Sequence, residues 1–86
     1  MYKICSTSAV VMSDDGVVGV VAKDDIREVI LSTLRKNRSI VYVMYQGFWY
    51  SCFPQIERGV VVGYTRDNIE DGQTVSKLDR FMNRNI

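Results

Sequence analysis

Apolar residues are densest between residues 39 and 64, where three runs of strand-forming side chains follow one another. Two runs flank the pair Gln46-Gly47, and the third covers residues 60–64. Valine, isoleucine and aromatic residues favour a pleated, packed surface, and glycine supplies the positive φ of a two-residue hairpin turn. The pattern predicts a three-stranded meander in which Tyr45 lies opposite Phe48.

The register of this hairpin assigns its side chains to two faces, because neighbours along a strand alternate. One face carries the pairs Tyr45–Phe48, Val43–Tyr50 and Val41–Cys52, and the other carries Met44–Trp49, Tyr42–Ser51 and Ile40–Phe53. Pro54 is expected to end the second strand, since it cannot donate to the ladder. Residues 55–59 are then a loop.

A first hairpin is predicted upstream, from strands at residues 2–12 and 17–22. Ser13-Asp14-Asp15-Gly16 has the composition of a turn, and Gly16 suits its left-handed position. A four-residue turn places Met12 opposite Val17 and Ala9 opposite Val20.

Two amphipathic helices complete the set of expected elements. Residues 23–37 carry acids in their first turn and cations in their last, and they place Ile26, Val29, Ile30 and Leu34 on one stripe. The second helix is expected to be capped by Gln73 or Thr74 and to reach Arg84. Its apolar face comprises Val75, Leu78, Phe81 and Met82.

The element order is ββαβββα, which predicts an α+β domain spanning residues 1–86. We expect a single five-stranded, mainly antiparallel sheet with two helices on one face. The crossover helix returns the third strand parallel to the second, which leaves room for the first strand between them. Two strand orders satisfy this, 2-1-5-4-3 and 2-1-3-4-5.

This element order resembles that of roadblock and longin domains, which share a profilin-like sheet with helices. The first hairpin, residues 9–18 with the sequence AVVMSDDGVV, is similar to the opening strand-turn-strand of roadblock domains. The resemblance implies a non-enzymatic module that dimerises or binds other proteins, often GTPases or their regulators. It transfers no functional residue.

Composition narrows the class of protein. The 47% hydrophobic content is too high for a disordered chain, and a net charge of +1 argues against a general polyanion binder. Cys5 and Cys52 are expected to be reduced core thiols, because no signal peptide is recognisable at the start of the sequence. No apolar run has the length of a membrane-spanning helix, and we expect a cytoplasmic protein.

Motifs for catalysis, metal binding or cofactor binding are missing from the sequence. The absence of histidine removes the commonest general base at neutral pH. Residues 67–78 lack the bidentate acid of a calcium loop, since Leu78 stands at its twelfth position. No phosphate-binding glycine loop occurs. A catalytic carboxylate pair stays open, but the sequence selects no pair among Asp24, Asp25, Glu57, Asp67, Glu70 and Asp71. We expect a protein that is not an enzyme and has no cofactor or metal.

The aromatic residues of the meander suggest a protein interface. Two helices on one face would leave the other face uncovered, and large exposed apolar patches usually mark interaction surfaces. Because Val41 and Val43 suit the helix stripe, the side chains left for a partner are Tyr42, Met44, Trp49 and Phe53. A second copy of the chain is the simplest partner, which would make a homodimer.

A nucleic-acid interface is the alternative. Lys77, Arg80 and Arg84 form a basic stripe on the last helix, and sheet aromatics can stack unpaired bases. On balance the sequence favours a small protein-binding module. Such a module would be an accessory regulator or inhibitor, of the kind that phages and bacteria encode.

Overall fold

The computed structural model describes residues 8–14, 16–37 and 39–85. The strands are β1 (Ser8–Ser13), β2 (Gly16–Ala22), β3 (Val41–Tyr45), β4 (Phe48–Glu57) and β5 (Val60–Asn68). A short 3₁₀ turn, η1 (Lys23–Asp25), leads into helix α1 (Ile26–Asn37), and helix α2 (Gly72–Asn85) closes the chain. The expected strand residues 2–7 lie outside the described part.

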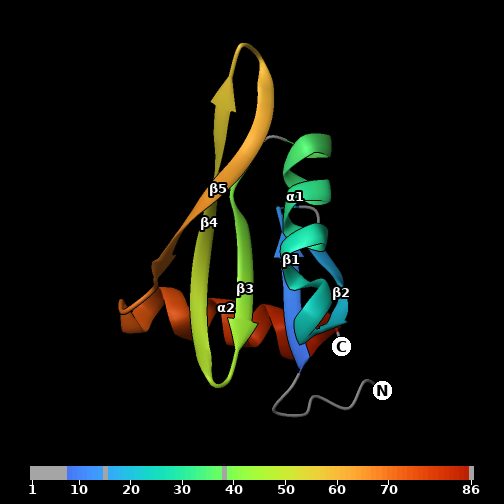
Figure 1. Ribbon diagram of the computed structural model, residues 1–86. Coiled ribbons are helices and arrows are strands. Elements are labelled where there is room, and N and C mark those ends of the chain that lie inside the picture. Colours follow the sequence, from blue (N-terminus) through green and yellow to red (C-terminus); the bar gives the residue numbers. More distant parts are fainter. Residues whose placement is uncertain (1–7, 15, 38, 86) are drawn as a thin grey trace.

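The strands form one five-stranded sheet in the order β2-β1-β3-β4-β5, and every neighbouring pair is antiparallel. This confirms the α+β class and the second of the two predicted strand orders. The α1 crossover carries the chain from edge strand β2 to β3, so that β1 lies between them (Figure 1).

The prediction that both helices share one face is wrong. In Figure 1, α1 lies in front of the sheet and α2 runs across the strands behind it. Two separate clusters of buried residues reflect this arrangement, one including Leu34 of α1 and the other Met82 of α2. The physical reason is that β1, β3 and β4 are apolar on both faces. Each face therefore needs its own helix.

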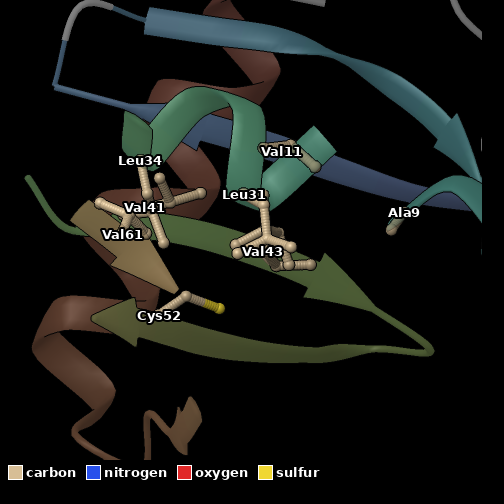
Figure 2. Packing of buried hydrophobic residues seen from close by; sticks show 9 residues of the cluster. Ala9, Val11, Leu31, Leu34, Val41, Val43, Cys52 and Val61 are labelled. Carbon is tan, nitrogen blue, oxygen red and sulfur yellow. The ribbon is translucent and has the colours of Figure 1, made fainter. Parts of the chain in front are cut away.

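The larger cluster lies beneath α1. In Figure 2, Leu34 of the helix lies beside Val41 and Val61, and Leu31 lies beside Val43. Val41 and Cys52 are fully buried there, on adjacent strands. The predicted stripe of α1 is confirmed, since all four of its residues belong to this cluster or pack against it.

The predicted turn of the central hairpin is also confirmed. Tyr45 pairs with Phe48 across a two-residue turn, in which Gln46 has a φ of 51° and Gly47 a φ of 83°. Two successive positive φ values are those of a type I′ turn, whose twist matches that of the strands. The expected pairs from Val41–Cys52 to Met44–Trp49 follow from it.

Pro54 does not end β4, contrary to the prediction. It pairs with Tyr64, and β4 and β5 continue to a second two-residue turn at Arg58 and Gly59, with φ values of 52° and 78°. The Trp49 carbonyl accepts a hydrogen bond from the N–H of Ile69, so the backbone polar groups of Trp49 point toward β5. These groups alternate in direction along a strand, and the Pro54 nitrogen, five residues on, therefore points toward the β3 side. The pairing of β3 with β4 stops at Val41 and Cys52, so no β3 residue lies beside Pro54 and no backbone donor is needed there.

The first hairpin keeps the Met12–Val17 pair but not the expected pair of Ala9 with Val20. Ala9 pairs with Val21, because a bulge shifts the register between Val11 and Met12. The extra residue is Val18, which lies in β2 between Val17, the partner of Met12, and Gly19, the partner of Val11. A bulge of this kind is invisible to a simple alternation rule.

The cap of α2 is Asp71, not Gln73 or Thr74. One Asp71 carboxylate oxygen accepts from the backbone N–H of Gln73 at 3.1 Å, and the other accepts from the Thr74 hydroxyl at 2.7 Å. These bonds, with the Thr74 hydroxyl contributing most, lower the pKa of Asp71. The carboxylate thus satisfies the Gln73 N–H, one of the backbone donors that the first helical turn leaves without an intrahelical partner.

Candidate functional site

Trp49 is a core residue of the α2 face. Its side chain is 2% exposed and packs in one cluster with Val10, Met12 and Met82. Its indole Nε1–H donates a hydrogen bond of 2.7 Å to Oδ1 of Asp79 on α2. This bond joins the start of β4 to the middle of the helix and satisfies the one polar atom of the ring.

The interface predicted at Tyr42, Met44, Trp49 and Phe53 rested on an uncovered sheet face, and that premise is wrong. Tyr42 and Met44 pack with Trp49 in the cluster beneath α2. Phe53 lies on the same face by alternation, is half-buried and falls outside this cluster. The structure thus brings three of the four residues together as core, and we place the proposed docking surface on other residues.

The basic stripe of α2 is exposed. Lys77, Arg80 and Arg84 line a shallow hollow of about 290 Å³ together with Phe81. Phe81 was expected in the apolar face, but its side chain is 38% exposed. It lies one residue before the buried Met82, a helical rotation of about 100° that turns it toward the edge of the apolar face.

The sheet aromatics do not form a continuous platform for bases. Tyr45 and Tyr50 pack against the cluster beneath α1, whereas Tyr42 and Trp49 belong to the cluster beneath α2. Phe48, which begins β4 beside the turn, is 57% exposed. Any nucleic-acid interface would therefore rest on α2 rather than on the sheet.

Comparison with family models, with curated protein sequences and with solved structures found no match. The resemblance to roadblock and longin domains therefore stays a prediction. None of the helices among residues 8–14, 16–37 and 39–85 combines the length and apolar character that crossing a bilayer requires.

The end of the β4–β5 hairpin is a feature that the sequence interpretation missed. Residues 55–62, which we call the distal arm, extend beyond α1 in Figure 1. Ile56, Val60 and Val62 expose 47%, 57% and 49% of their side chains. The sequence predicted a loop at residues 55–59 and a strand only from residue 60, although Arg58-Gly59 repeats the turn signal of Gln46-Gly47.

The distal arm is held at Val61 from the α1 side. Val61 is buried in the cluster beneath α1, and its carbonyl accepts a hydrogen bond of 3.4 Å from Nε of Arg35. Val60 and Val62, on either side of it, remain exposed. The arm therefore presents apolar side chains from a strand whose position the core fixes.

Chemically reactive groups are few in the described part of the chain. No cluster of three acids or thiols there could hold a metal ion. Burial raises the pKa of the Cys52 thiol from 9.0 to about 11, with Arg66 nearby opposing the rise. A thiol protonated in this way is a poor nucleophile at neutral pH, because the thiolate is the reactive form.

Proposed function

We propose that this protein is a non-catalytic binding module that docks on a larger protein, or on a second copy of itself, through the distal arm. The observation that carries the proposal is the exposure of Ile56, Val60 and Val62 on one projecting hairpin. Val60 and Val62 lie two residues apart on β5 and so share one face of the arm, and exposed apolar patches on soluble proteins are typical of interaction sites.

The open edge of β5 suits this role. β5 is an edge strand, so its outward N–H and C=O groups have no neighbouring strand among the described residues. An extended segment of a partner can pair with such an edge while its side chains cover neighbouring apolar groups. The open edge of β4 beyond β3 is less suitable, because Pro54 removes a donor from it.

The size and single sheet of the module suit an accessory regulator or inhibitor. We propose that it acts in the cytoplasm, that a phage or a bacterium encodes it, and that a homodimer is one form of the docked state. A two-fold axis would allow two β5 edges to pair antiparallel and two arms to cover each other. The resemblance to roadblock and longin domains, which dimerise and bind proteins, agrees with this proposal.

The test uses the tagged chain to capture partners from a nuclease-treated lysate of source cells, and it measures how much is captured. An untagged copy of the chain is added to the lysate so that self-association is detected as well. Changing Val60 and Val62 together to threonine retains β-branching but places a hydroxyl in the contact. We expect the double variant to weaken capture about tenfold or more, since each desolvated hydroxyl costs about 1 kcal/mol.

Val18→Thr is the matched control, because Val18 is 47% exposed on β2 at the opposite edge of the sheet. It should leave capture unchanged. The proposal is contradicted if Val18→Thr and the double arm variant behave alike, or if nothing that resists nuclease is captured.

Single-stranded RNA or DNA binding through α2 is the second candidate function. It is favoured by one specific observation, the exposed Phe81 ring in a hollow with Lys77, Arg80 and Arg84. An aromatic ring beside cations can stack a base while the cations contact phosphates. The stripe is short, however, and three phosphate contacts support only weak binding.

Salt dependence tests this second candidate. If three cations contact phosphates, replacing all three by alanine should reduce the slope of log affinity against log salt by about 2. Phe81→Leu should weaken binding without changing that slope, because stacking releases no counterion. Absence of binding to mixed single strands at micromolar protein and low salt would remove this candidate.

A further inference from the structure

A cavity of about 230 Å³ lies between the start of α1 and the sheet. Its apolar lining includes Ile26 and Ile30 from the helix and Val43 and Cys52 from the sheet. Figure 2 shows Val43 and the Cys52 sulfur on neighbouring strands beneath α1. The inner wall of the cavity is therefore apolar, and it belongs to the cluster beneath α1.

The polar lining of this cavity carries positive charge. Lys23 of η1, Arg27 of α1 and Arg66 of β5 converge on it from three elements, and none of the acids that the structure describes lines it. The neighbouring acids Asp25 and Glu28 line a separate hollow that α1 forms with β2. The chain as a whole carries a net charge of only +1. The positive charge is therefore concentrated at this cavity, where it favours the binding of an anion.

Aromatic rings form the remaining wall. Tyr45, Tyr50 and Tyr64 come from β3, β4 and β5, and all three are half-buried. The guanidinium carbon of Arg66 lies 5.0 Å from the centre of the Tyr50 ring, and that of Arg27 lies 5.7 Å from the centre of the Tyr64 ring. Both cations therefore lie against rings that line the same cavity.

We propose that this cavity binds a small aromatic anion, a single ring that carries a carboxylate or a phosphate. The ring would lie against the tyrosines and the apolar wall, and the anionic group would meet Arg27 and Arg66, whose planar guanidinium groups suit both kinds of oxyanion. The cavity is smaller than the roughly 300–1,000 Å³ that holds drug-sized ligands. This limits the ligand to a single ring.

The first test is an NMR titration of the isotope-labelled full chain with phenyl phosphate and with benzoate. We expect saturable shifts of amides that line the cavity, with a dissociation constant of about 1 mM for a ligand of about ten heavy atoms. Inorganic phosphate supplies the anionic group alone, and benzyl alcohol supplies the ring alone. Each should bind at least about fivefold more weakly than phenyl phosphate. Equal binding of either half, or no saturable shift, overturns the proposal.

Charge variants locate the site. Arg27→Gln and Arg66→Gln replace exposed side chains and should each weaken phenyl phosphate binding about fivefold or more. Lys36→Gln is the matched control, because Lys36 is exposed near the opposite end of α1 and lines a separate hollow, and it should leave the affinity unchanged. Equal affinity of the Arg27→Gln/Arg66→Gln double variant and the unaltered chain would overturn the proposal.

A thiol readout is independent of the charge variants. In a Cys5→Ser chain Cys52 is the single remaining thiol, and it lines the cavity. Saturating phenyl phosphate should slow the alkylation of Cys52 about tenfold. The bound ligand blocks a reagent that enters the cavity, and it stabilises the folded chain against a reagent that reacts only with the unfolded one. An unchanged alkylation rate would count against binding at this cavity.

Discussion

At the scale of single residues, the hydrogen bond from Trp49 to Asp79 joins the sheet to α2. The indole is 2% exposed, so its N–H has no access to bulk water and depends on this acceptor. None of the buried side-chain polar atoms described in the structure lacks a partner. Removing the acceptor therefore changes a fully satisfied core into one with an orphaned donor.

Asp79→Ala should lower the free energy of unfolding by about 1–3 kcal/mol, the cost of a buried donor without a partner. Urea denaturation followed by Trp49 fluorescence measures this directly. Asp79→Asn is the control, because its amide oxygen can still accept, and it should retain most of the stability. Equal losses for the two variants would mean that this hydrogen bond does not stabilise the fold.

Cys52 gives the fold a pH dependence at the alkaline end. Burial raises the pKa of the thiol to about 11 in the folded chain, above its ordinary 9.0. The folded state therefore retains its proton where the unfolded state has lost it. This contribution is fully present below pH 9 and is lost as the pH rises toward 11.

The Cys52→Ala variant tests this dependence. Between those two pH values the Cys5→Ser chain should lose about 2 kcal/mol more stability than the same chain carrying Cys52→Ala. Denaturant titrations at several pH values measure the difference. Parallel stability curves for the two chains would contradict the assignment of the raised pKa to Cys52.

At the scale of elements, two type I′ turns organise the meander. The sequence predicted the first, at Gln46-Gly47, together with the register that follows from it. The second, at Arg58-Gly59, carries the same signal but was hidden by the rule that proline ends a strand. That rule depends on which edge the proline nitrogen faces. Residue type alone does not give this information.

Gly47→Val should destabilise the chain by about 1 kcal/mol or more, because a β-branched residue is strained at a φ of 83°. Thermal unfolding measures the loss. Gly19→Val is the matched control, since no atom lies within 4 Å of an added Cβ there and the position needs no positive φ. If the two variants unfold alike, the turn geometry does not determine the stability of the hairpin.

At the scale of the whole molecule, helices cover both faces of the sheet. The sequence predicted the class, the strand order as one of two, the stripe of α1 and all of the α2 stripe except Phe81, because these follow from periodicity and turn chemistry. It did not predict the face taken by α2. Residues 69–71, which connect β5 to α2, carry no pattern that selects a face.

The same limit explains the interface residues. Alternation assigned Tyr42, Met44 and Trp49 correctly to one face. Because α2 was predicted on the wrong face, these core residues were predicted to lie on the surface. The exposed side chains of the distal arm become visible only once β4 and β5 are known to extend beyond β3 and α1. The molecule measures 38 × 27 × 20 Å, an elongated shape for a chain of this length.

Site-specific photo-crosslinking tests the central claim, docking through the distal arm, most directly. A photoreactive residue would replace Val62 in one chain, Val18 in a second and Phe81 in a third, and each would be irradiated in source-cell lysate. We predict a discrete, nuclease-resistant protein adduct from position 62 that is absent from position 18 at the opposite sheet edge. Equal adducts from positions 62 and 18, or adducts from position 81 alone, would contradict the claim.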